Sequence, residues 1–177
     1  HGSATWCERL LDAVERERPD RILLLGDVLY HGPRNDLPEG YAPKQVIAML
    51  NQLAASIIAV RGNCEAEVDQ MVLDFPCMAD YSTILDPTAT RAADGSERAT
   101  PGCELFLTHG FHNSVDRLPE LPQGSVLLYG HTHRKVSEPA PGHDGVWAFN
   151  PGSVSIPKDG THSCGMYEDG ALRHVEL

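Results

Sequence analysis

The 177-residue chain lacks the features that mark membrane proteins and disulfide-rich secreted proteins. It has no run approaching the roughly 18 consecutive apolar residues of a membrane span, and no basic stretch followed by an apolar signal segment. Its cysteines number only five, are widely spaced and form no C-x-x-C pair, which argues against a disulfide framework or a zinc ribbon. We therefore expect a cytoplasmic protein with reduced thiols and no membrane partner.

Positive charge is also scarce. The 14 lysines and arginines face 25 acidic residues, and the net charge of −11 opposes attraction to long nucleic acid. A small phosphate ester remains compatible with this charge, because two divalent ions would add about four positive charges at a local site. With 41% hydrophobic residues, the chain can bury one core, so residues 1–177 are expected to form a single domain.

The first half of the chain alternates between helical and strand patterns. Ser3 is a candidate N-cap for a helix over residues 4–17, and Pro43 suits the first position of a second helix whose apolar face runs to Leu53. A third helical pattern covers residues 65–74. Residues 22–25 and 56–60 are short apolar runs typical of strands buried on both faces, and a loop is expected over residues 28–42. This alternation predicts parallel strands in an α/β arrangement.

The second half has strand patterns without intervening helices. They cover residues 81–85, 104–107, 126–129, 146–149, 164–167 and 172–175. We expect these strands to pair antiparallel in a second sheet. Between the first two, the polar residues 86–102 are typical of a flexible hairpin loop.

Four of the apolar strands run directly into a glycine and a potential metal ligand. Binding sites in α/β proteins form outside the carboxyl ends of strands, so these ligands are expected to converge. Asp27 or Asn63 alone is more often a cap or turn residue, and an isolated His109 is more often simply hydrogen-bonded. His131 and His133 are a stronger signal, because alternate residues of an extended segment point the same way. This mix of carboxylate, amide oxygen and imidazole is typical of a site for Mn²⁺, Fe or Zn²⁺ rather than of a thiolate-rich zinc site.

These residues resemble the ordered motifs of the calcineurin-like metallophosphoesterases, namely D-x-H, G-D, G-N-H-[DE], a lone histidine and G-H-x-H. The matching segments here are Gly26-Asp27, Gly62-Asn63-Cys64-Glu65, Thr108-His109-Gly110 and Gly130-His131-Thr132-His133. The chain is similar over nearly its whole length to the YfcE-type bacterial phosphodiesterases of this family. The resemblance implies a four-layer αββα sandwich of two mixed sheets.

The resemblance also implies an activity, which is hydrolysis of a small phosphodiester by a hydroxide held between two divalent ions. Mn²⁺ is the expected metal, with Fe, Zn²⁺ and Ni²⁺ as alternatives. Asp27 would bridge both ions; His1 and His133 would complete the shell of one ion, and Asn63, His109 and His131 that of the other. Asn63 and His131 are also assigned to catalysis, since the amide nitrogen of Asn63 could donate to a phosphate oxygen.

His1 stands where the family has the histidine of D-x-H. The aspartate of that motif, and the buried strand that would carry it, are therefore expected upstream of residue 1. The alternative is that residues 1–3 are left over from an expression tag. Without the aspartate, the ion held by His1 would lose a ligand and bind weakly.

Cys64 and His31 are further candidates for the catalytic set. Cys64 stands where many family members have a histidine proposed to protonate the leaving group, and YfcE-type proteins share the cysteine. His31 stands where the protein phosphatase branch has a phosphate-binding arginine, and it could supply the proton instead. The alternatives are that Cys64 merely packs at a helix start and that His31 is an ordinary loop residue.

Three functions compete. The first is a phosphoric diester hydrolase. The second is a protein-interaction scaffold of weak activity, as in the retromer subunit that the chain also resembles. The third, a nuclease acting on long nucleic acid, is opposed by the charge and by the lack of a basic stripe or stacking aromatics. Retention of every ligand after position 1 favours the hydrolase, and a homo-oligomer stays open.

Overall fold

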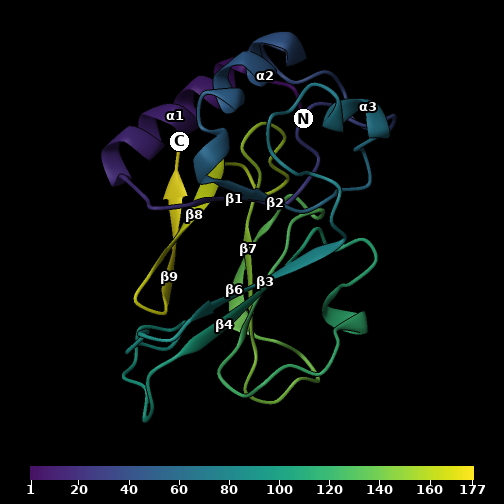
Figure 1. Ribbon diagram of the computed structural model, residues 1–177. Coiled ribbons are helices and arrows are strands. Elements are labelled where there is room, and N and C mark those ends of the chain that lie inside the picture. The colour runs from purple at the N-terminus through teal and green to yellow at the C-terminus, as the bar shows by residue number, and fades with distance from the viewer.

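The structure, a computed structural model, describes residues 1–177 (Figure 1). The helices α1 (Ala4–Glu17), α2 (Pro43–Asn51) and α3 (Glu67–Gln70) lie together on one side of a small parallel sheet made of β1 (Ile22–Leu24) and β2 (Ile57–Ala59). The predicted alternation of helices and parallel strands is therefore confirmed. No helix is both long enough and apolar enough to cross a membrane.

The first two helices begin where the local sequence predicts. The Ser3 hydroxyl accepts a hydrogen bond from the Trp6 N–H at 3.2 Å and so caps α1. Pro43 occupies the start of α2, where its missing N–H costs no helical hydrogen bond. Each helix turns one apolar face to the small sheet, with Cys7 of α1 and Val46 of α2 buried in the same core.

The third predicted helix is wrong in extent, because only Glu67–Gln70 are helical. Val68, Met71 and Val72, which belong to its predicted apolar face, are 58%, 82% and 39% exposed. A short helix whose apolar face has no core to pack against gains little stability. The segment ends in a tight turn, in which the Met71 N–H donates to the Val68 carbonyl.

The second half of the chain forms a five-stranded sheet and a separate hairpin (Figure 1). The strands of the sheet lie in the order β3 (Tyr81–Asp86), β4 (Cys103–Thr108), β5 (Val126–Leu128), β7 (Trp147–Pro151) and β6 (Lys135–Pro139). The hairpin strands are β8 (Ser163–Glu168) and β9 (Ala171–Glu176), and the 3-10 turns are η1 (Ala54–Ser56) and η2 (Val115–Arg117).

Antiparallel pairing throughout this half is wrong for the centre of the large sheet. The pairs β3–β4, β6–β7 and β8–β9 are antiparallel, whereas β4–β5 and β5–β7 are parallel. Residues 109–125 separate β4 from β5 and are long enough to carry the chain back across the sheet, as parallel pairing requires. The carboxyl ends of β4 and β5 consequently lie at the same edge.

The sequence pattern does not predict β6. Its residues Lys135–Pro139 are mostly polar and exposed, and the strand ends on a proline at the edge of the sheet. Proline is tolerated there because an edge strand leaves one row of N–H groups unpaired. An edge position therefore explains why the strand carries no apolar pattern.

Residues 86–102, predicted to be a flexible hairpin loop, connect β3 to β4 and pack against the turn between β8 and β9. The Thr90 N–H and hydroxyl donate to the Asp169 carboxylate at 2.7 and 2.6 Å. Ala89 is fully buried and Ala93 is 6% exposed. The loop is thus tied to the hairpin turn along its first part.

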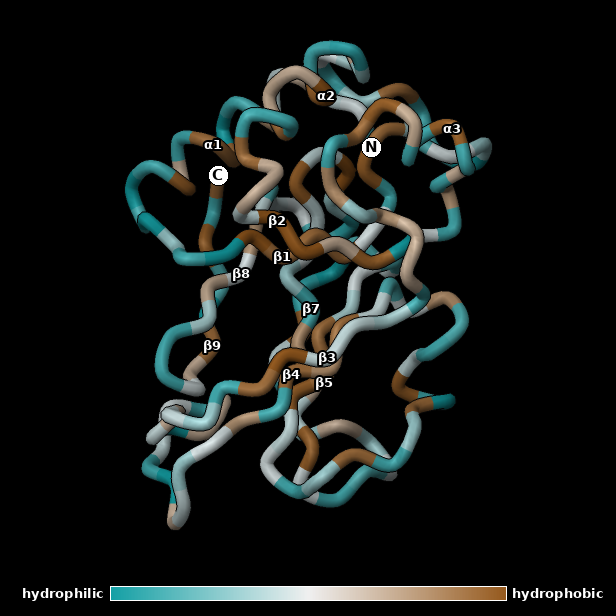
Figure 2. Tube along the Cα trace, in the orientation of Figure 1, coloured by the Kyte–Doolittle hydropathy of each residue, from teal (hydrophilic) through white to brown (hydrophobic).

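An apolar core joins the two sheets. Leu23 and Ile58 of the small sheet pack with Leu107 and Leu128 of the large one, and Figure 2 shows hydrophobic segments along β1, β2 and β4. Helices cover the outer face of the small sheet. On the outer face of the large sheet, the segment around η2 packs on Phe106, so the second helical layer of the predicted sandwich is reduced to a 3-10 turn.

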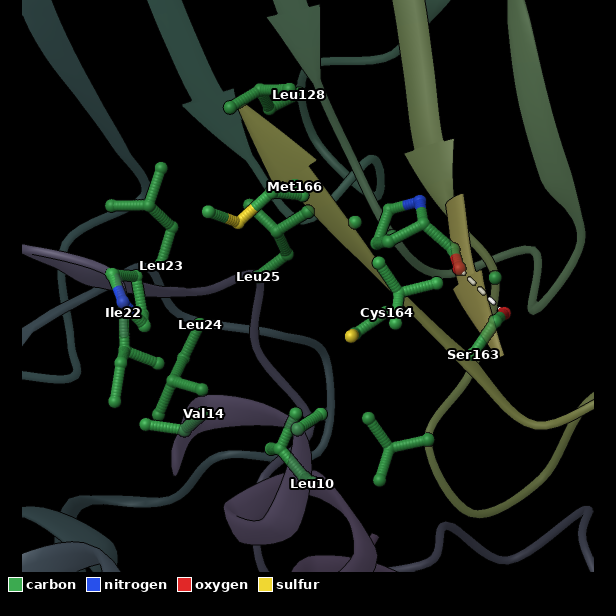
Figure 3. A pocket seen from close by; sticks show the side chains of 18 of the residues that line it. Leu10, Val14, Ile22, Leu23, Leu24, Leu25, Leu128, Ser163, Cys164 and Met166 are labelled. Carbon is green, nitrogen blue, oxygen red and sulfur yellow. Dashed lines mark hydrogen bonds between the residues drawn. The ribbon is translucent and has the colours of Figure 1, made fainter. Parts of the chain in front are cut away.

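A cavity of about 780 Å³ lies between α1, β1 and the β8–β9 hairpin. In Figure 3, Leu10 and Val14 of α1 lie on one side of it and Cys164 and Met166 of β8 on another. Residues 22–25 also line the cavity, and β1 pairs with β2 along one edge only. One end of the cavity is lined by five of the candidate metal ligands, His1, Asp27, His109, His131 and His133.

Candidate metal centre

The candidate ligands come together at the boundary between the two sheets. Asp27 and Asn63 follow the parallel strands β1 and β2, while His109 and His131 follow the parallel strands β4 and β5. Parallel pairing brings the carboxyl ends within each sheet to one edge, and the shared core holds the two edges against each other.

His109 is at the centre of one group of contacts. Its Nε2 atom lies 3.3 Å from Asp27 Oδ2 and 3.0 Å from Asn63 Oδ1. His131 Nδ1 lies 3.2 Å from the same nitrogen. Asp27, His109 and His131 each contribute one ligand atom, and these three atoms lie within 4.8 Å of one another. They are therefore close enough to bind one metal ion.

His1 and His133 form a second group on the other side of Asp27. Their Nε2 atoms are 2.9 Å apart, and His1 Nε2 lies 3.9 Å from Asp27 Oδ2. The main-chain nitrogen of His1 donates to the Asp27 carbonyl at 2.7 Å, which holds the histidine beside that residue. All six predicted ligands thus lie in one continuous cluster with Asp27 in its middle.

Main-chain carbonyls fix the orientation of three of the rings. The Nδ1 atoms of His1, His109 and His133 lie 3.1, 2.6 and 2.7 Å from the carbonyl oxygens of Tyr30, Leu25 and Ile156. A carbonyl can only accept, so each Nδ1 carries the proton and each Nε2 presents a lone pair to the cluster. Histidines that bind metal ions in proteins are held in this way.

Lone pairs consequently face each other at two places. His1 Nε2 faces His133 Nε2, and His109 Nε2 faces Asn63 Oδ1, in both cases at hydrogen-bond distance and with no proton assigned to either atom. Two facing acceptors repel each other unless a proton or a metal cation lies between them. The residues present therefore fit two divalent cations, one on each side of Asp27.

The electrostatics of the cluster favour a bound cation. Burial raises the pKa of the Asp27 carboxyl, but the hydrogen bond and charge of His109 outweigh burial and hold that pKa below its ordinary value. Burial lowers the pKa of His109, but the hydrogen bond and charge of Asp27 more than offset this and raise it, so the carboxylate favours positive charge at this position. Burial is the main cause that lowers the pKa of His131 and of His133, which keeps both rings neutral and able to bind metal.

Three candidate ligands have strained backbones. Asp27, His131 and His133 have φ angles of 58°, 64° and 59°, a left-handed conformation that costs a non-glycine residue about 1–3 kcal/mol. The other two such residues, Arg18 and Asp169, lie at a helix end and in a hairpin turn, where this conformation is common. Concentration of the remaining strain in the cluster is typical of a functional site.

A family model described as the calcineurin-like phosphoesterase superfamily domain matches residues 1–169 of the chain. The chain belongs to the calcineurin-like phosphoesterase superfamily. The ordered strand-end residues that suggested this membership are those that the fold gathers into the cluster.

Within this superfamily, the chain is similar to Escherichia coli YfcE in both sequence and structure. Phosphodiesterase YfcE of Escherichia coli strain K12 is 45% identical over 178 residues, covering 100% of this chain and 88% of that protein. A solved structure of E. coli YfcE, described as a phosphoesterase, superposes with a TM-score of 0.83 at 42% identity, covering 99% of this chain and 93% of that one.

A second solved structure, of an archaeal phosphodiesterase, has a TM-score of 0.59 at 21% identity and covers 98% of this chain and 92% of that one. At this identity it shows a shared fold alone. The calcineurin-like phosphoesterase fold expected from the sequence is therefore confirmed.

Cys64 lies against the cluster, whereas His31 does not contact it. The Cys64 N–H donates to Asp27 Oδ1 at 2.9 Å, and Asn63 Nδ2 donates to the Cys64 sulfur at 3.3 Å. Burial, with Asp27 close by, raises the pKa of the Cys64 thiol to about 12. The His31 ring packs edge-on against Tyr30 and Tyr41, and its buried Nδ1 has no hydrogen-bond partner.

Asn150, which the sequence pattern predicts to be a turn residue, supports the loop that carries His131 and His133. Its fully buried amide donates to the Gly130 carbonyl at 2.7 Å and to the Thr132 hydroxyl at 3.1 Å. An asparagine followed by Pro151 and Gly152 is typical of a turn. That pattern conceals the supporting role, which only the three-dimensional contacts reveal.

Proposed function

We propose that the chain is a metal-dependent phosphodiesterase that hydrolyses a small phosphodiester at this cluster. The observation that carries the proposal is the pair of facing acceptors on either side of Asp27, where a metal cation would relieve the repulsion. The phosphodiesterase named among its relatives, at 45% identity over the whole chain, supports the reaction class. On this basis the chain is a phosphoric diester hydrolase.

Each ion would be held by its own group of side chains. His1, His133 and Asp27 would hold one, and the other would be held by the second group, Asn63, His109, His131 and Asp27. Two divalent ions at such a site supply an activated water and neutralise the negative charge that develops on the phosphoryl oxygens.

The residues around the ions have separate tasks. Asp27 presents Oδ2 to both groups, while the Cys64 N–H holds its other oxygen, so the carboxylate would be available to an ion on either side. Asn63 turns its oxygen to His109 and donates one amide hydrogen to the Cys64 sulfur, which leaves the other available to donate to a phosphoryl oxygen. His131, on the exposed side of His109, is placed to complete the shell next to the substrate.

Two residues are candidates for protonating the leaving alcohol. Cys64 contacts the cluster directly, and its protonated thiol is a weak donor. His31 has a free ring nitrogen, and its neighbour Gly32 lies close enough to Cys64 that an added methyl would be 3.2 Å from the sulfur. We assign proton donation to His31 and a packing role to Cys64.

The ligand atoms indicate the metal, the net charge indicates the size of the substrate, and the cysteines indicate the location. Carboxylate and amide oxygens combined with imidazole nitrogens suit Mn²⁺, with Fe, Zn²⁺ and Ni²⁺ as alternatives. The net charge of −11 favours a small diester over a long nucleic acid. All five cysteines are free thiols, which supports a reducing, cytoplasmic location.

The proposal is tested by following hydrolysis of bis(p-nitrophenyl) phosphate and of p-nitrophenyl phosphate, with and without Mn²⁺. We expect Mn²⁺-dependent hydrolysis of the diester, lost in His131→Ala and retained in the matched control His112→Ala, whose ring is exposed and outside the cluster. Equal activity of the two variants, or hydrolysis of the monoester alone, would refute the proposal.

A further inference from the structure

Glu65 is a buried carboxylate that none of the roles above uses. It follows Asn63 and Cys64 in the loop between β2 and α3, and it is only 5% exposed. It is absent from both groups of ligand atoms that could hold an ion. Removing a carboxylate from water is unfavourable, so a buried carboxylate needs compensating hydrogen bonds.

Those hydrogen bonds come from the main chain of two different loops. The N–H groups of Asp27 and Val28, just after β1, donate to Glu65 at 2.8 and 2.6 Å. The Gly62 N–H, just after β2, donates to the same oxygen as Asp27 does. One side chain thus bonds the loop that carries Asp27 and the loop that carries Asn63.

The two loops approach each other too closely to tolerate side chains between them. A methyl group on Gly26 would overlap the Gly62 nitrogen and Cα, and one on Gly62 would overlap Asp27 and the Glu65 carboxylate. Glu65 therefore closes a junction in which two backbones meet directly, with Asp27 in a strained left-handed conformation on one side.

We propose that Glu65 is a positioning residue, which sets the spacing between Asp27 and Asn63 by holding both strand-end loops through its carboxylate. This inference rests on the proposed function for its effect on catalysis, and on geometry alone for its effect on the loops. Since Asp27 and Asn63 belong to the two sides of one ion position, loss of Glu65 would misplace ligands without removing any.

The test compares Glu65→Gln with the matched control Glu67→Gln, two residues further on, where the side chain is 86% exposed. Amide hydrogen exchange at Asp27 and Gly62 in the metal-free protein reports on the loops, titration calorimetry on Mn²⁺ affinity, and steady-state kinetics on kcat and KM. We expect faster exchange at both amides, Mn²⁺ affinity and kcat each about 10- to 100-fold lower, and little change in KM in Glu65→Gln. Glu67→Gln should match the wild type.

Glu65→Asp, which keeps the charge but draws the acceptor back by one methylene, serves as the second variant if Glu65→Gln does not fold. Wild-type exchange rates at Asp27 and Gly62 in a folded Glu65 variant would overturn the inference. An inactive wild type would refute the proposed function instead, and the exchange measurement would still decide the role of Glu65.

Discussion

Asp27 and His109 contact each other across the boundary between the two sheets, with His109 Nε2 3.3 Å from Asp27 Oδ2. The opposite ring nitrogen of His109 donates to the carbonyl of Leu25, two residues before Asp27, at 2.6 Å. A single histidine at the end of β4 therefore binds both the end of β1 and the carboxylate beyond it. The contact that ties the sheets together is also the centre of the candidate metal site.

The junction between the two strand-end loops predicts a sharp steric effect. Gly62→Ala would place a methyl group against Asp27 and Glu65, so we expect kcat/KM to fall by about 100-fold or more, because small misplacements of catalytic groups carry such a cost. The control is Gly142→Ala, where an added methyl meets nothing within 4 Å and the strain of a side chain at a φ of 76° arises outside the cluster. Kinetics of the two folded variants make the comparison, and equal rates would contradict the account of the junction.

Much of the candidate site can be predicted from the sequence, because every candidate ligand except His1 closely follows an apolar strand. Asp27, Asn63 and His109 could be placed at strand ends without knowledge of how the strands pair. What the pattern could not reveal are interactions made by main-chain atoms. Glu65 stands in a matched motif and Asn150 in a turn, but the N–H groups that Glu65 binds and the carbonyl that Asn150 binds cannot be inferred from residue spacing.

The sequence predicts the fold where an element is buried and therefore carries an apolar pattern. It does not predict elements that are exposed. The strands β1 and β4 carry the apolar runs that a buried strand needs. The exposed edge strand β6 lacks such a run, and α3 carries an apolar face that stays exposed. The parallel pairing of β4 with β5 depends on the path of residues 109–125, which hydrophobic periodicity does not encode.

The assignment of proton donation to His31 predicts an effect that depends on the leaving group. We expect His31→Ala to lower kcat/KM by about 100-fold for a diester with an alkyl leaving group, and much less for one with p-nitrophenolate, which needs no proton. Steady-state kinetics on both substrates provide the measurement, with His112→Ala as the control. Unchanged kcat/KM for both would remove His31 from the mechanism.

A hydrogen bond between β8 and β3 predicts a pH-dependent contribution to stability. The Tyr167 hydroxyl donates to Asp86 at 2.8 Å. Burial raises the pKa of the Asp86 carboxyl, but hydrogen bonds from Thr88 and Tyr167 outweigh it and hold that pKa below its ordinary value. A depressed pKa stabilises the fold above the unfolded value of about 3.9, and the effect disappears as pH falls through the folded value.

Tyr167→Phe should therefore lower the free energy of unfolding by about 1 kcal/mol at neutral pH and by less once Asp86 is protonated. Urea denaturation at about pH 7 and about pH 3 measures the difference. The matched control is Tyr81→Phe, because Tyr81 is 57% exposed. A Tyr167→Phe effect of equal size at both pH values would show that ionised Asp86 is not the partner that matters.

The most direct test of the central claim is a titration of metal-stripped protein with Mn²⁺, in which the initial rate of bis(p-nitrophenyl) phosphate hydrolysis is followed against ions added per chain. The two acceptor pairs around Asp27 predict a rate that starts near zero and reaches its plateau at about two ions per chain. Full activity without metal, or no activity at any metal concentration, would contradict a two-metal phosphodiesterase and favour a protein-interaction scaffold.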